Sequence, residues 1–66
     1  MNINKENRLS LAKESLEVAL KMLSRFDGDN IHASEIGRIL DAAIQATQAS
    51  QQLNQLVGIL QAELGS

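Results

Sequence analysis

The residues best suited to chemistry surround one histidine. His32 is the only histidine in the chain, and Asp27, Asp29 and Glu35 lie within five residues of it. An imidazole beside carboxylates can act as a general base or bind a metal ion. A solvent-exposed or capping histidine at a loop–helix junction explains the same residues with fewer assumptions. We therefore expect no catalytic residue here.

Metal and cofactor sites are equally poorly supported. The segment 27–30 reads Asp-Gly-Asp-Asn, but the ligand and glycine spacing of an EF-hand calcium loop is not met. The chain has no cysteine, which excludes disulfides and thiolate zinc sites. It also has no glycine-rich phosphate loop and no nucleophile elbow. We expect a non-catalytic protein without metal or cofactor.

DNA binding is the main alternative. The segment 34–40 resembles the first helix of a helix-turn-helix motif, which would make 46–53 the recognition helix. Asp41 stands where the turn usually has glycine, and Ala42, Thr47 and Ser50 replace expected apolar residues. The segment 45–55 carries no Lys or Arg to hold phosphates. A small DNA-binding regulator is therefore the less favoured function.

The distribution of charge excludes other partners. Residues 1–26 hold five basic and three acidic residues, a local charge of +2, whereas residues 27–66 hold one basic and five acidic residues, a local charge of −4. No basic cluster indicates a nucleic-acid surface, and no apolar run is long enough to span a membrane. The polar N-terminal residues do not resemble a signal peptide, so we expect a cytoplasmic protein.

The elements that position these residues are two helices forming one domain, 1–66. The turn residues 27–30 separate a helix of about 5–26 from a helix of about 31–64. Apolar residues recur at spacings of three and four in both segments, as on one side of an amphipathic helix. In the first segment they are Leu9, Ala12, Leu16, Ala19, Leu23 and Phe26. In the second they are Ile36, Ile39, Ala43, Ala46, Ser50, Leu53, Val57, Leu60 and Leu64.

The size of the chain favours a partner. A domain of 66 residues buries too little surface to be very stable alone, and without disulfides or a metal a partner chain is the usual remedy. The unequal helices would leave 56–64 without an internal partner, unless the chain breaks near 51–54 and folds back as a third helix. We predict an all-α helical hairpin paired as a homodimeric four-helix bundle, or bound to a helix of another protein. The predicted interface residues are Leu16, Leu23, Ile36, Ile39, Leu53, Leu56, Val57, Leu60 and Leu64.

The layout of a helix over 9–26, a turn at 27–30 and a long helix to Leu64 resembles two groups of small proteins. One group is the short all-helical accessory proteins of lambda-type temperate phages, which bind host or phage proteins. The other is the hairpin co-chaperones of type III secretion, which hold a needle subunit. The resemblance to the phage proteins is preferred, and it implies a regulatory or adaptor role through protein–protein binding.

Overall fold

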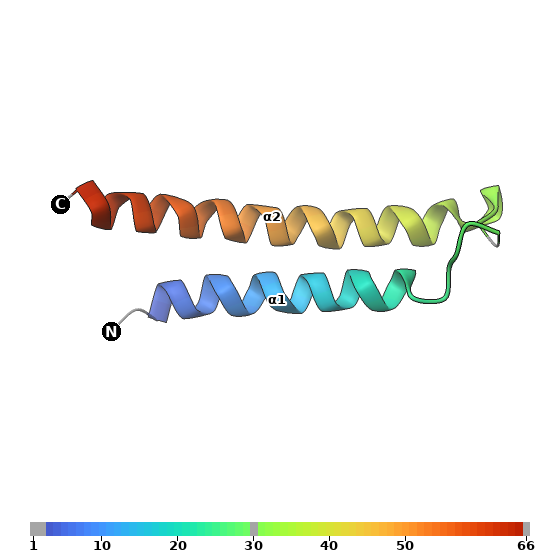
Figure 1. The fold of residues 1–66 in the computed structure, drawn as a ribbon, viewed down its shortest axis with the longest axis horizontal. Helices are drawn as coiled ribbons and strands as arrows, with labels where there is room; N and C mark the ends of the chain where they lie inside the picture. The colour runs from blue at the N-terminus through green and yellow to red at the C-terminus, as the bar shows by residue number, and fades with distance from the viewer. Residues whose placement is uncertain (1–2, 30, 66) are drawn as a thin grey trace.

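The computed structural model describes residues 3–29 and 31–65 and is an antiparallel hairpin of two helices (Figure 1). Helix α1 covers Ile3–Leu23 and helix α2 covers Ile36–Gly65, with one turn of 3₁₀ helix, η1, at Ala33–Glu35. The two helices differ in length, 21 residues against 30. The predicted all-α hairpin with a long second helix is therefore confirmed.

Helix α1 ends three residues earlier than the sequence pattern predicts. The Ser24 hydroxyl donates to the Lys21 carbonyl at 2.9 Å, and the Phe26 N–H donates to the Leu23 carbonyl at 3.0 Å. These bonds use carbonyls that the last turn of a helix leaves without intrahelical partners. The apolar spacing extends to Phe26, but hydrogen bonding at the helix end stops the helix at Leu23.

The connection between the helices is longer than the predicted turn of four residues. Its first part is a turn in which the Asp29 N–H donates to the Asp27 carboxylate at 2.9 Å. Its last part is η1, and helix α2 begins directly after it at Ile36. The Arg25 guanidinium donates to the Glu35 carboxylate at 2.9 Å across this connection. The contact ties the end of α1 to the start of α2.

The extra length of α2 is divided between the two ends of the hairpin. At 1.5 Å per residue α1 is about 32 Å long and α2 about 45 Å, and Figure 1 shows α2 extending beyond α1 both at the end near the termini and at the loop end. At the end near the termini Lys5 Nζ donates to Glu63 Oε1 at 2.8 Å. The expectation that 56–64 has no internal partner is wrong for Leu56 and Ile59, which are half-buried, whereas Leu64 is 88% exposed. A third helix is not formed, since α2 continues unbroken through 51–54.

The two helices meet along a row of small residues, which we call the inner seam. Ala12 and Ala19 of α1 and Ala42 and Ala49 of α2 are the buried apolar residues in the described chain. Each pair is seven residues apart, so each stays on one side of its helix along two turns. Alanine at these positions lets the two backbones approach closely. The inner seam is therefore narrow and contains no large buried side chain.

Polar side chains flank the inner seam. Arg8 and Gln52 are half-buried, and Arg8 Nη1 donates to Gln52 Oε1 at 3.0 Å. Ser15 and Gln45 are also half-buried. Leucine or isoleucine would be expected at such positions in a self-sufficient helix pair. The interior of the hairpin is thus small and partly polar.

Candidate functional site: an apolar face across both helices

The large apolar side chains of this protein lie mainly outside the hairpin. In α1 the exposed ones are Leu9, Leu11, Leu16, Val18, Leu20 and Leu23. In the connection and α2 they are Ile31, Ile36, Leu40, Ile44, Leu53, Val57, Leu60 and Leu64. Single exposed leucines are ordinary on protein surfaces, whereas a contiguous group marks an interaction site. The question is therefore which of these side chains share one face.

Helical spacing places many of them on the same side of the hairpin. Leu16 and Leu23 each follow a buried alanine of α1 by four residues, and Leu53 follows Ala49 of α2 by four. A step of four residues turns a helix by about 40° beyond a full turn. In two antiparallel helices that face each other, this step leads to the same side of the pair. These leucines therefore form one surface.

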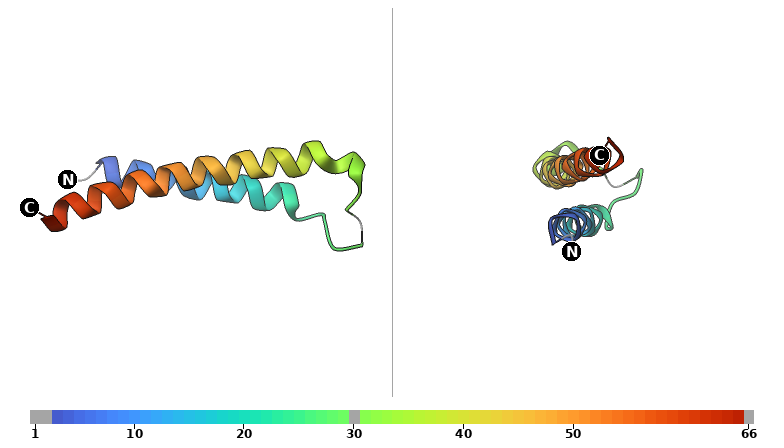
Figure 2. Two further views of the ribbon diagram at one scale, coloured as in Figure 1. Left: turned by 90° about the horizontal axis from the view of Figure 1, so that it is seen from above. Right: turned by 90° about the vertical axis from the view of Figure 1, so that its left-hand side faces the viewer.

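We call this surface the apolar face and define it by twelve residues. From α1 it contains Leu9, Leu16 and Leu23. From α2 it contains Ile36, Ile39, Ala43, Ala46, Ser50, Leu53, Val57, Leu60 and Leu64. Ile39 is half-buried, and the other eleven are exposed. None of the twelve is charged. The right-hand view of Figure 2, which looks along the helices, shows two neighbouring helices with no further described helix covering either side of the pair.

The opposite side of the hairpin is more polar. It carries the exposed Leu11 and Val18 from α1 and Ile44 from α2, but α2 also contributes Asp41, Gln48 and Gln55 there. The apolar residues on this side are thus bordered by charged and amide groups. The two sides of the same hairpin differ in character, and the apolar face is the stronger candidate for binding.

Eight of the nine interface residues predicted from sequence lie on the apolar face. They are Leu16, Leu23, Ile36, Ile39, Leu53, Val57, Leu60 and Leu64. Leu56 does not, because it continues the seven-residue spacing of Ala42 and Ala49 along the inner seam and is half-buried there. Leu9 belongs to the face although the sequence analysis did not assign it to the interface. Its spacing of seven from Leu16 was the available signal.

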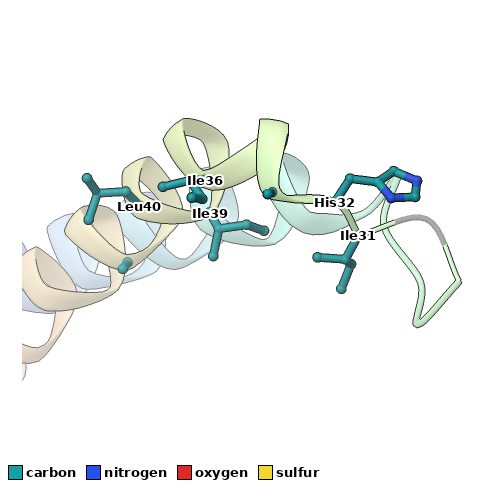
Figure 3. A pocket seen from close by; sticks show the side chains of 7 residues that line it. Ile31, His32, Ile36, Ile39 and Leu40 are labelled. Carbon is teal, nitrogen blue, oxygen red and sulfur yellow. The ribbon is translucent and has the colours of Figure 1, made fainter.

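A hollow of about 520 Å³ opens at the loop end, where α2 extends beyond α1 (Figure 3). Its lining residues are Ile31, His32, Ala33, Ile36, Ile39, Leu40 and Ala43. Three of them, Ile36, Ile39 and Ala43, also belong to the apolar face, so the hollow continues that surface. Ile31 and Leu40 complete it. Neither residue could be assigned to a hollow from sequence, because the hollow depends on the overhang of α2 at the loop end.

The structure places the Glu35 carboxylate, which is near His32 in sequence, in contacts with arginines. His32 is exposed at the edge of the hollow, and Figure 3 shows its imidazole on the loop side. The Glu35 carboxylate is bound instead by Arg25 at 2.9 Å and lies 3.5 Å from Arg38 Nε. No group of three metal-ligating side chains occurs in the described part of the chain. The carboxylate near His32 in sequence thus serves to fasten the loop end.

The helix-turn-helix arrangement expected for the DNA-binding alternative is not present. That motif requires a turn near Asp41 between two helices, whereas α2 runs without a break from Ile36 to Gly65. Thr47 lies inside this helix, and its hydroxyl donates to the Ala43 carbonyl at 2.9 Å. The segment 46–53 is therefore not a separate recognition helix. Asp41 and Thr47 are exposed positions of one long helix.

Comparisons with protein-family models, curated proteins and solved structures find no match to this chain. In the described residues, neither α1 nor α2 has a stretch apolar enough to cross a lipid bilayer.

Proposed function

We propose that this protein is a non-catalytic interaction module that assembles with a second copy of itself through the apolar face, in a regulatory or adaptor role. One observation carries the proposal. Leu16 and Leu60 are 47% and 43% exposed, while the buried positions of the inner seam hold alanine. The hydrophobic effect scales with apolar area removed from water, so the hairpin alone leaves much of its potential stabilisation unused.

The dimensions of the apolar face fit a stable dimer. The hairpin measures 51 × 17 × 16 Å, so one long side covers about 850 Å². Stable protein–protein interfaces bury about 800 Å² on each partner. Two hairpins stacked on this side would form a four-helix bundle, whose core consists of the residues that the single hairpin exposes.

The charge pattern supports a second copy as the partner. Helix α2 has no charged residue between Asp41 and Glu63, so two such helices can pack without burying a charge. An interface between identical chains must also avoid placing like charges opposite each other. The nine residues that α2 contributes to the apolar face meet that condition because none is charged, and Lys13 of α1 borders the face beside Leu9.

Substitution of Leu60 by aspartate tests the proposal, and Leu11 provides a matched control. Both leucines are 43% exposed, but Leu60 lies on the apolar face and Leu11 on the opposite side. Leu60→Asp would place a charge in the bundle core of each copy, so we expect the dissociation constant to rise at least a hundredfold. Leu11→Asp should change it by less than tenfold. Sedimentation over a hundredfold concentration range measures both.

The wild-type mass decides the result first. A mass near twice 7.2 kDa supports self-assembly, and a helical monomer at every concentration contradicts it. If Leu60→Asp and Leu11→Asp weaken a wild-type dimer equally, the dimer does not use the apolar face. Detection uses refractive index or peptide absorbance, because the chain has neither Trp nor Tyr.

A further inference from the structure

The residues of α2 on the apolar face are arranged symmetrically about Ser50. One row is Ile36, Ala43, Ser50, Val57 and Leu64, and the second row is Ile39, Ala46, Leu53 and Leu60. The first row is centred on residue 50, and the second row is centred half a residue before it. A two-fold axis through this point would bring both rows of one α2 onto the same rows of a second, antiparallel α2.

Side-chain sizes near the centre of the two rows are complementary under this operation. Ala43 falls opposite Val57 of the second copy, and Ala46 falls opposite Leu53 of the second copy. Each of these two contacts combines a small side chain with a large one, which favours close packing. Ser50 meets its own equivalent at the axis, where a small side chain permits close approach. The α2 helix is in this sense complementary to itself.

The ends of α2 complete the match. Ile36 and Leu64 each lie fourteen residues from Ser50, which is about 21 Å along the helix. The same axis therefore places Leu64 of one copy opposite Ile36 of the other, and Leu60 opposite Ile39. Ile36 and Ile39 line the hollow at the loop end, and Leu64 is 88% exposed at the other end.

We infer that two copies pack α2 against α2 in antiparallel orientation about Ser50, with Leu60 and Leu64 of each copy covering the loop-end hollow of the other. This inference rests on the proposed self-assembly and specifies its geometry. A chain cannot fill its own hollow, because Ile36 and Leu64 are about 42 Å apart along one helix. The overhang of α2 at the loop end is thus the docking site for the C-terminal end of the second α2.

Single-cysteine variants test this geometry cleanly, since the natural chain has no cysteine. Ser50→Cys should give a disulfide-linked dimer on mild oxidation, because the axis brings its two copies within the Cα separation of about 4.4–6.8 Å that a disulfide needs. Gln48→Cys, two residues away on the opposite side of the hairpin, is the matched control and should stay largely monomeric on a denaturing gel. An equimolar mixture of Ile36→Cys and Leu64→Cys chains should form a mixed dimer more than tenfold faster than either chain alone.

A second way of stacking the hairpins provides the contrary result. If α1 of one copy lay on α2 of the other, Leu16 would face Ala46, and a mixture of Leu16→Cys and Ala46→Cys would link instead. That outcome, with Ser50→Cys unlinked in a dimer of normal mass, overturns the geometry and leaves the proposed function standing. A monomeric wild-type chain contradicts both the geometry and the proposed self-assembly. Cross-linking of Ser50→Cys and Gln48→Cys at equal rates also overturns the geometry, because it indicates collision without a fixed axis.

Discussion

Helix α2 presents two adjacent surfaces. The buried one lacks the large apolar residues usual in a core, and the exposed one carries them. The inner seam against α1 is buried but made of Ala42 and Ala49, with Gln45 and Gln52 beside them. The apolar face is exposed but carries Leu53, Leu60 and other large apolar residues. Burial of large apolar side chains stabilises a fold most, so the surface that could contribute more stabilisation on burial is the one that the hairpin leaves exposed.

The difference indicates that the two surfaces have different tasks. Small residues on the inner seam set a short distance between α1 and α2 and hold them in one alignment, with Arg8 and Gln52 adding a directional hydrogen bond of 3.0 Å. Large residues on the apolar face provide area. Under the proposed self-assembly, alignment within a chain and affinity between chains would be assigned to neighbouring sides of one helix, and each side could be changed separately.

The largest expected effect comes from enlarging the inner seam. Ala49 is 1% exposed, so Ala49→Leu has no space and should lower the free energy of unfolding by about 1–3 kcal/mol. Ala62→Leu is the matched control, because Ala62 is exposed in the same helix, on the opposite side of the hairpin from the apolar face. Thermal unfolding followed by circular dichroism measures both. Equal melting temperatures for Ala49→Leu and wild type would show that the inner seam is wrongly placed.

A medium effect of opposite sign is expected at Gly58. This glycine lies in the interior of α2, away from both surfaces, and a Cβ added there meets no atom within 4 Å. Gly58→Ala should therefore raise the free energy of unfolding by about 1 kcal/mol, through helix propensity alone. The dissociation constant per folded chain should stay the same. A changed dissociation constant at unchanged stability would mean that Gly58 itself contacts the second copy. Helix α2 would then have a third packing surface besides the inner seam and the apolar face.

The smallest expected effect concerns the ion pair at the open end of the hairpin. Lys5 and Glu63 form a hydrogen-bonded pair with side chains 23% and 48% exposed. Pairs this accessible contribute about 0.2–1 kcal/mol and are screened by salt. Glu63→Gln should lower the free energy of unfolding by no more than that, and less at 1 M NaCl than at 50 mM. A loss above 2 kcal/mol would mean that the ion pair, rather than the alanines, fixes the alignment of the helices.

The sequence was sufficient to predict the two helices, but not to predict which side of each helix packs against the other. The stripe from Leu9 to Phe26 combines two surfaces, since Ala12 and Ala19 lie on the inner seam whereas Leu9, Leu16 and Leu23 lie on the apolar face. Periodicity finds the apolar side of a helix, but it does not say which part of a wide apolar side faces the same chain. The matching pairs of alanines seven residues apart in both helices were the relevant signal.

The loop end was less predictable for a different reason. The turn residues at 27–30 lie within the break between the helices. The exact end of α1 at Leu23 and the start of α2 at Ile36 depend on local hydrogen bonds and on the contacts of Glu35. Helix α1 ends three residues before the predicted end, so the first turn of α2 extends beyond it, in addition to the overhang of α2 at the C-terminal end. The hollow lined by Ile31 and Leu40 lies at this loop-end overhang.

The four alanines of the inner seam also have a consequence for how long the protein lasts in a cell. A hairpin held by such small side chains is weakly stable by itself, so in the proposed dimer assembly would provide much of the folding free energy. The folded fraction then depends on the amount of chain present. Newly made or diluted chains open readily and are exposed to proteases, whereas chains above the dissociation constant are protected. The lifetime of the protein would thereby be set by its own concentration.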